Sequence, residues 1–93
     1  KNQRFLMAKR MENAALDLYE GLTAAARRPG PAALPSLEAA DGHLANLKVY
    51  NRLCKDLQLL AFNQYEHLAG MLDETGRLLG GWQQACRQRS GSA

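Results

Sequence analysis

The feature that most constrains the fold of this chain is the spacing of its apolar residues, which recur at alternating steps of three and four along three long segments. This spacing places them on one side of an α-helix, whereas a β-strand requires alternation at every second residue. The first stripe consists of Met7, Met11, Ala14, Leu18, Leu22 and Ala25. Because no segment has the period of a strand, the sequence predicts an all-α protein.

Two further stripes follow. The second consists of Leu37, Leu44, Leu47, Cys54, Leu57 and Ala61, and the third of Tyr65, Leu68, Leu72, Thr75, Leu79, Trp82 and Cys86. A proline-rich loop that includes Pro29 and Pro31 ends the first helix, because proline cannot donate a backbone hydrogen bond or fit inside the next turn. Ser36 is the expected N-cap of the second helix, and Asn63 with Glu66 forms an expected capping box of the third.

We therefore expect a single helical-bundle domain over residues 1–89, with helices over about residues 4–27, 36–60 and 63–89, and a flexible tail over residues 90–93. Only Ala61 and Phe62 join the last two helices, which predicts an antiparallel hairpin. With 93 residues, 46% of them hydrophobic, the chain has the composition of a folded protein but buries only a modest fraction of its surface by itself. The prediction is an antiparallel three-helix bundle that forms oligomers.

Basic residues are concentrated in parts of the chain, and the formal net charge is +3. The cations of the first ten residues are Lys1, Arg4, Lys9 and Arg10, with no acid among them. In the second helix, Lys48, Arg52 and Lys55 follow at i, i+4 and i+7, so they project from one face with a spacing that can follow a phosphate backbone. The alternative is a solvated face opposite the core, next to Asp56.

Three glycines, Gly76, Gly80 and Gly81, interrupt the third helix just before Trp82. Inside a helix each glycine costs about 1 kcal/mol relative to alanine. This cost predicts that another backbone comes close, either within the bundle or between subunits. A phosphate-binding loop is the weaker alternative, since it requires a strand-to-helix turn. Arg77, in the same segment, is either a candidate ligand contact or a surface cation paired with Asp73 one turn earlier.

No catalytic or metal-binding pattern is recognisable. His43 and His67 have no partner at metal-ligand spacing and no nucleophile beside them, so we expect neither an enzyme, nor a cofactor, nor a metal. Cys54 and Cys86 fall on apolar stripes and are interpreted as reduced thiols. No apolar run approaches the roughly 20 residues needed to cross a bilayer. These observations predict a soluble, cytoplasmic protein without a membrane partner.

Five blocks, in their order and spacing, resemble Avd, the accessory variability determinant of diversity-generating retroelements. The blocks are NQRF (residues 2–5), RMENAALDL (10–18), NRLCKDL (51–57), QYEHL (64–68) and GRLLGGW (76–82), which together span nearly the whole chain. Members of that family are four-helix bundles that assemble into basic homopentamers and bind the reverse transcriptase and template RNA of the element. The three helices expected here match the last three of the four, and the loop from Pro29 to Pro35 is a variable part of the family.

The resemblance implies a non-catalytic protein that supports mutagenic retrohoming, that is, error-prone cDNA synthesis from a template repeat. Its partners would be the reverse transcriptase, the template RNA with its cDNA, and further copies of this chain, most simply as a pentamer. The candidate contacts to nucleic acid or polymerase are Arg4, Lys9, Arg10, Lys48, Arg52, Lys55 and Arg77, and the candidate packing or oligomer contacts are Gly76, Gly80, Gly81 and Trp82.

Two alternatives stay open. The same fold occurs in proteins encoded in intervening sequences of bacterial large-subunit ribosomal RNA genes, which the five blocks resemble less well. The third hypothesis is a purely structural homo-oligomer whose basic face is only solvated. The family pattern also has a helix before the block that begins here at Lys1, and without that helix the apolar stripe it covers would be exposed.

Overall fold

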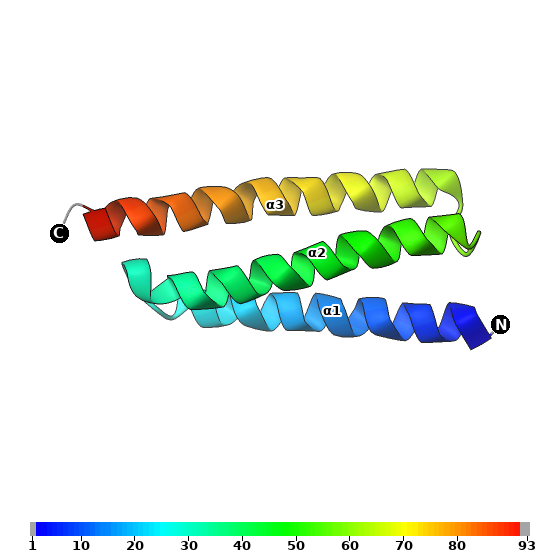
Figure 1. Cartoon of the computed structure of the whole chain (residues 1–93), viewed down its shortest axis with the longest axis horizontal. Coiled ribbons are helices and arrows are strands. Elements are labelled where there is room, and N and C mark those ends of the chain that lie inside the picture. Colours follow the sequence, from blue (N-terminus) through cyan, green and yellow to red (C-terminus); the bar gives the residue numbers. More distant parts are fainter. Residues whose placement is uncertain (1, 92–93) are drawn as a thin grey trace.

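The structure is a computed structural model that describes residues 2–91 and, within them, the side chains of residues 4–88. It consists of three long helices, α1 (Asn2–Ala26), α2 (Leu34–Asp56) and α3 (Phe62–Gly91), with a short 3-10 helix, η1 (Gly30–Ala33), before α2. The long helices lie side by side in alternating directions and extend over 53 × 20 × 13 Å (Figure 1). The expectation of an antiparallel all-α bundle is confirmed, and no strand occurs in residues 2–91.

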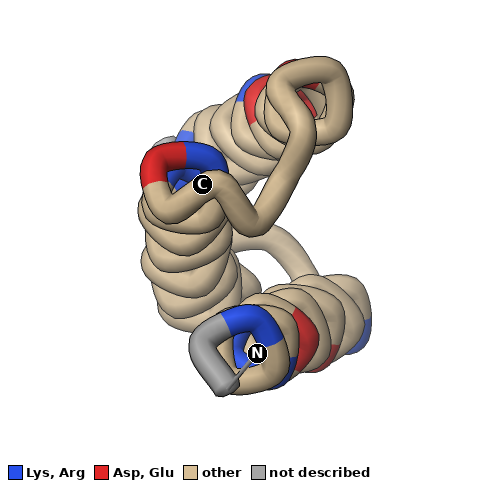
Figure 2. The backbone as a smooth tube through the Cα atoms, turned by 90° about the vertical axis from the view of Figure 1, so that its right-hand side faces the viewer, with Lys and Arg blue, Asp and Glu red and all other residues tan. Residues whose placement is uncertain are grey.

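The central helix is α2, which packs against α1 on one side and α3 on the other, while no Cα atom of α1 lies within 8 Å of one of α3 in the part of the chain that the structure describes. Seen end-on, the three helices form an arc with one open side (Figure 2). The core consists of Ala14, Leu18, Ala25, Ala33, Leu37, Ala40, Leu44, Leu47, Leu72, Leu79 and Cys86. The apolar stripes expected from the sequence therefore meet along the two sides of α2.

The contact between α1 and α2, which we call the α1–α2 seam, includes small residues. A Cβ atom added at Gly21 would lie 3.3 Å from the Ala40 Cβ, and Ala14 and Ala25 of α1 are buried. Side chains this small let two helix backbones approach closely and make many dispersion contacts. Gly21 was not among the glycines that the sequence analysis singled out.

The start of α2 differs from the expectation at Ser36. The helix begins at Leu34, directly after η1, with Ala33 in the N-cap position and no side-chain cap. Pro35 falls in the first turn, where its missing N–H is harmless and its fixed φ suits a helix. Pro35 therefore belongs to the first turn of this helix and not to the loop before it, and Ser36 lies in the same turn.

The end of α2 comes at Asp56, four residues before the expected end, so the connection to α3 has five residues instead of two. Gln58 adopts a left-handed conformation with φ 61°. Its N–H donates to the Lys55 carbonyl at 3.0 Å, and the Leu59 N–H donates to the Cys54 carbonyl at 2.8 Å. These two bonds form a Schellman motif, which ends helices most often at glycine. Glutamine in this position explains why the sequence analysis missed the helix end.

The start of α3 is capped two residues earlier than the expected Asn63–Glu66 box. The Ala61 N–H donates to Gln64 Oε1 at 3.0 Å, so Gln64, and not Glu66, reaches back to the N-cap residue. Asn63 Oδ1 accepts a bond from the Gln64 N–H at 3.0 Å. At its other end α3 continues to Gly91, two residues beyond the expected end, and residues 92–93 of the expected tail lie outside the described residues.

Candidate nucleic-acid interface

The basic triad of α2 lies along the contact between α2 and α3, which we call the α2–α3 seam. Lys48 Nζ is 3.4 Å from Asp73 Oδ1 on α3. Arg52 Nε and Lys55 Nζ lie 3.7 Å and 3.6 Å from the two carboxylate oxygens of Asp56. Every member of the triad therefore has an acidic neighbour, which the i, i+4, i+7 spacing did not predict for Lys48.

These ion pairs are too weak to withhold the triad from a ligand. The side chains of Lys48 and Asp73 are 46% and 76% exposed, and those of Arg52 and Asp56 are 66% and 54% exposed. Exposed ion pairs contribute about 0–1 kcal/mol and weaken further as salt is added. A phosphate that approaches the seam can therefore replace the carboxylates at little cost, and the triad remains a candidate phosphate contact.

Lys55 has a second neighbour that orients it. Its Nζ lies 4.9 Å from the centre of the Tyr65 ring, a cation–π contact between α2 and the first turns of α3. The Tyr65 ring in turn lies 6.1 Å from that of Phe62, tilted by 38°. One end of the seam thus combines a cation with two aromatic rings.

Asn51 is the residue of the seam that the sequence analysis overlooked. It is 1% exposed, and its Nδ2 donates to the Tyr65 carbonyl at 3.2 Å. Its Oδ1 is buried without a hydrogen-bond partner among the described residues, a state that costs about 1–3 kcal/mol. A signal was available, because the predicted stripe of α2 steps by seven residues from Leu47 to Cys54, and Asn51 fills that step at the helical spacing.

A cavity of about 250 Å³, which we call the seam cavity, lies between α2 and α3 at this place. It is lined by Lys48, Asn51 and Arg52 of α2 and by Tyr65, Ala69, Leu72 and Asp73 of α3. Two of the seven candidate contacts are therefore brought together around one cavity, with a buried amide between them.

The candidates of α1 lie at the same end of the bundle as Lys55, because the first turns of α1 lie beside the last turns of α2 (Figure 1). Arg4, Lys9 and Arg10 are exposed, and no ion pair to them is found among the described residues. In the end-on view, the tube carries Lys and Arg positions of both helices at this end (Figure 2). Arg10 lines a separate cavity of about 180 Å³ on the α1–α2 seam, together with His43 and Tyr50.

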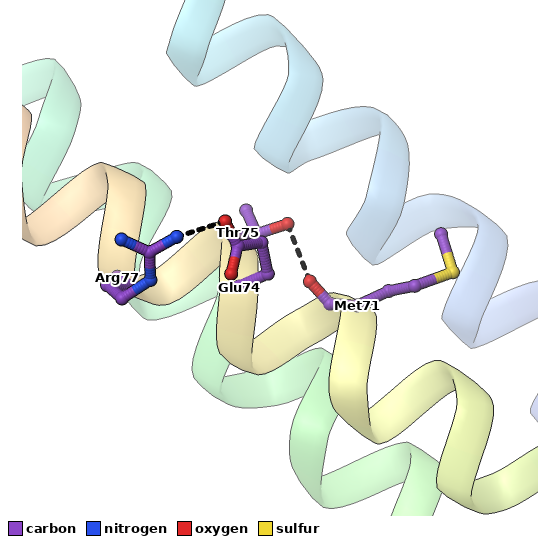
Figure 3. A network of polar contacts seen from close by, with 4 residues as sticks. All are labelled: Met71, Glu74, Thr75 and Arg77. Atoms are coloured by element: carbon purple, nitrogen blue, oxygen red, sulfur yellow. Dashed lines mark hydrogen bonds and ion pairs between the residues drawn. The ribbon is translucent and has the colours of Figure 1, made fainter.

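Arg77 lies apart from the triad. Its guanidinium binds the Glu74 carboxylate one turn earlier on α3, and the neighbouring Thr75 hydroxyl donates to the Met71 carbonyl at 2.9 Å (Figure 3). The alternative of a paired surface cation is thus what the structure shows, but the partner is Glu74 and not Asp73, because Asp73 faces Lys48 across the seam.

The glycines of α3 divide into two groups. A Cβ atom added at Gly76 would lie 3.3 Å from Leu44 Cδ2, so another helix does come close there. At Gly80 and Gly81 nothing in the described residues lies within 4 Å. The expected close approach within the bundle is therefore wrong for these two residues, and an approach between subunits stays a prediction. Trp82 is partly buried against the core.

No group of three His, Cys, Asp or Glu residues that could hold a metal ion occurs in the described part of the chain. Cys54 and Cys86 are buried free thiols. Burial raises the pKa of the Cys54 thiol, and its Sγ lies 3.7 Å from Met11 Sδ. Among the helices described, none has the length and apolar character needed to span a membrane.

Comparisons with known proteins agree with this architecture. A family model described as bAvd-like matches residues 1–86, which is most of the chain. No curated protein and no solved structure matched the sequence. The match confirms the resemblance of the five blocks to Avd, the accessory variability determinant of diversity-generating retroelements. By this match and by its all-helical fold, the chain belongs to the bAvd-like family.

Proposed function

We propose that this protein is the non-catalytic accessory subunit of a diversity-generating retroelement, and that it binds the reverse transcriptase and the template RNA to support mutagenic cDNA synthesis. The family match over residues 1–86 carries the proposal. The seven candidate cations support it, because six of them lie on α1 and α2 and include three exposed residues at the start of α1 without an ion pair among the described residues.

The proposal includes assembly into a homo-oligomer, taken as a pentamer from the resemblance. Several apolar side chains support association, because Phe5, Tyr19, Val49 and Leu78 are 61–69% exposed and lie on all three long helices. Exposed apolar residues in such numbers are typical of surfaces that bind another protein. In an oligomer, the cations of each copy would add to one positive surface, whose affinity for RNA falls steeply with salt.

The first test is the mass of the purified protein by light scattering, with and without a structured template RNA, at low and at high salt. A mass near five subunits that takes up RNA only at low salt is the expected result. A monomer or dimer that ignores RNA at low salt would contradict the proposal. Co-purification of a reverse transcriptase would separate it from the ribosomal intervening-sequence alternative.

The second test replaces Lys48, Arg52 and Lys55 with alanine. Because the ion pairs of Lys48 and Arg52 are exposed and the half-buried Lys55 contributes one further ion pair and a cation–π contact, we expect the variant to stay folded and assembled, with a free energy of unfolding lowered by about 1–2 kcal/mol. RNA affinity should fall strongly at low salt and little at high salt, since each lost phosphate contact reduces the salt dependence. The matched control is alanine at Arg27, Arg28 and Arg87, three cations at the other end of the bundle. Equal RNA binding by both variants and the natural protein would exclude the triad as an interface.

A structural homo-oligomer is the second candidate, and the acidic neighbours of the triad favour it. In that case the carboxylates of Asp56 and Asp73 would be the resting partners of the cations, with no other ligand. Oligomer formation without any salt-sensitive RNA binding would be its signature in the same light-scattering experiment.

A further inference from the structure

The Asn51 oxygen is the feature of the α2–α3 seam that phosphate binding leaves unexplained. Asn51 is 1% exposed, its Nδ2 donates to the Tyr65 carbonyl, and its Oδ1 has no partner in the part of the chain that the structure describes. The seam therefore keeps an unused hydrogen-bond acceptor beneath the surface. Buried polar groups are nearly always paired, so an unpaired one calls for a ligand or a role.

Burial divides the seam cavity into a rim and a floor. Lys48, Arg52 and Asp73 are exposed and form the rim, whereas Asn51 and Leu72 are buried and form the floor. A ligand at this place would meet two cations first and the Asn51 side chain beside an apolar side chain last, and Asn51 Oδ1 itself has less than 1 Å² of accessible surface. The volume of about 250 Å³ is somewhat smaller than the roughly 300–1,000 Å³ of sites for drug-sized molecules, so it suits a single ring system.

We propose that the seam cavity receives one unpaired base of a bound single-stranded RNA segment. The Asn51 amide turns toward the cavity so that its Oδ1 accepts an N–H hydrogen bond from the base, while the base lies near the Tyr65 ring and its phosphate lies on Lys48 and Arg52. Each of the four bases has at least one N–H donor on its pairing edge, which is free only when the base is unpaired. Aromatic rings beside cations are the usual surface for such a base. The inference rests on the proposed RNA binding and deepens it, because it adds a contact to a base where the triad contacts only phosphate.

The first experiment uses the natural protein and two small probes, cytidine 5′-monophosphate and ribose 5-phosphate, followed by NMR. Both probes carry the phosphate, and only the nucleotide carries a base. We expect both to shift the resonances of Lys48 and Arg52, and only the nucleotide to shift the Asn51 side-chain amide. The same response of Asn51 to both probes, or no response to either, would overturn the inference.

The second experiment compares a cytidine oligoribonucleotide with an abasic oligoribonucleotide of the same length and charge. The natural protein should prefer the base-containing strand, because only that strand can stack on Tyr65 and bind Asn51. Asn51→Leu, which keeps the shape and removes the amide, should reduce this preference by roughly 2- to 12-fold, the range that one hydrogen bond of ordinary net strength gives, and keep its affinity for the abasic strand. The matched control is Asn46→Leu, the same change at an exposed position of α2, which should keep the preference.

The outcomes separate this inference from the proposed function. Equal binding of both strands by the natural protein would overturn the base site and leave RNA binding intact. Binding of neither strand would overturn RNA binding and the base site together. If Asn51→Leu loses its helical circular dichroism, the variant is unfolded, and the NMR comparison of the two probes on the natural protein decides whether the base site exists.

Discussion

The two sides of α2 differ in how closely their helices approach and in what they bury. On the α1–α2 seam, Gly21 and Ala40 bring two backbones close together, and the cavity of about 180 Å³ on that seam is not lined by either residue. On the α2–α3 seam, Lys48 pairs with Asp73 beside a cavity that a buried Asn51 also lines. Close packing contributes stability, whereas an exposed ion pair contributes little and leaves its cation available to a ligand. The candidate site therefore lies on the seam that combines exposed cations with a buried amide.

The largest effect is expected on the tight seam, from Gly21→Leu. The added Cβ alone would lie 3.3 Å from the Ala40 Cβ and 3.5 Å from its Cα, and the larger side chain has to push α1 away from α2. We expect the free energy of unfolding to fall by about 1–3 kcal/mol, which lowers Tm by roughly 4–8 °C for each kcal/mol. Thermal unfolding by circular dichroism measures it. The control is Gly42→Leu, because no described residue lies within 4 Å of a Cβ atom added there. An equal loss of stability in both variants would contradict the close approach of α1 and α2 at Gly21.

The next effect is expected on α3, from Gly80→Ala. With no neighbour within 4 Å among the described residues, the substitution should raise the free energy of unfolding by about 1 kcal/mol through helix propensity alone. Gly76→Ala is the comparison. There Leu44 Cδ2 has to move to make room for the added methyl group, and this movement reduces the gain in stability. Calorimetry gives the stability and light scattering the mass. A lower oligomer mass for Gly80→Ala would instead assign Gly80 to a contact between subunits.

A smaller gain in the free energy of unfolding is expected from Gln58→Gly, in the connection between α2 and α3. A left-handed conformation costs a residue with a side chain about 1–2 kcal/mol. Glycine avoids this cost, but its unfolded chain is more flexible, and this flexibility cancels part of the gain in stability. The expected net gain is about 0.5–1 kcal/mol in urea unfolding. Gln58→Ala keeps the strain and should show no gain. If alanine stabilises as much as glycine, the left-handed conformation is not the cause.

The smallest effect on stability is expected from Asp73→Asn, which removes the partner of Lys48. The exposed ion pair should cost less than about 1 kcal/mol when lost, while RNA affinity at low salt should rise because Lys48 is free. Asp41→Asn makes the same charge change elsewhere on α2 and should raise the affinity less. Fluorescence anisotropy with a labelled RNA compares the two variants, and equal affinities would mean that Lys48 does not contact the RNA.

Much of the fold was predictable because helices are specified by local spacing. The spacing of apolar residues predicted the stripes that contain Leu18, Leu44 and Leu79, and all three residues are in the core. The helix ends were harder, because Gln58 occupies a position where glycine is the usual signal, and Pro35 begins a helix instead of preceding it. Gly21 gave no signal, since its need for a small side chain comes from Ala40 on another helix.

The sequence by itself determined that the chain is helical, where its apolar stripes run, and which family it resembles, because these depend on residues close together along the chain. The tertiary structure decided which cations meet a carboxylate, that Asn51 is buried with an unused oxygen, and that Gly76 faces a neighbour while Gly80 does not. Each of these depends on how α3 is rotated and placed against α2. Helical periodicity specifies the faces of a helix, and only the packing between helices specifies what each face contacts.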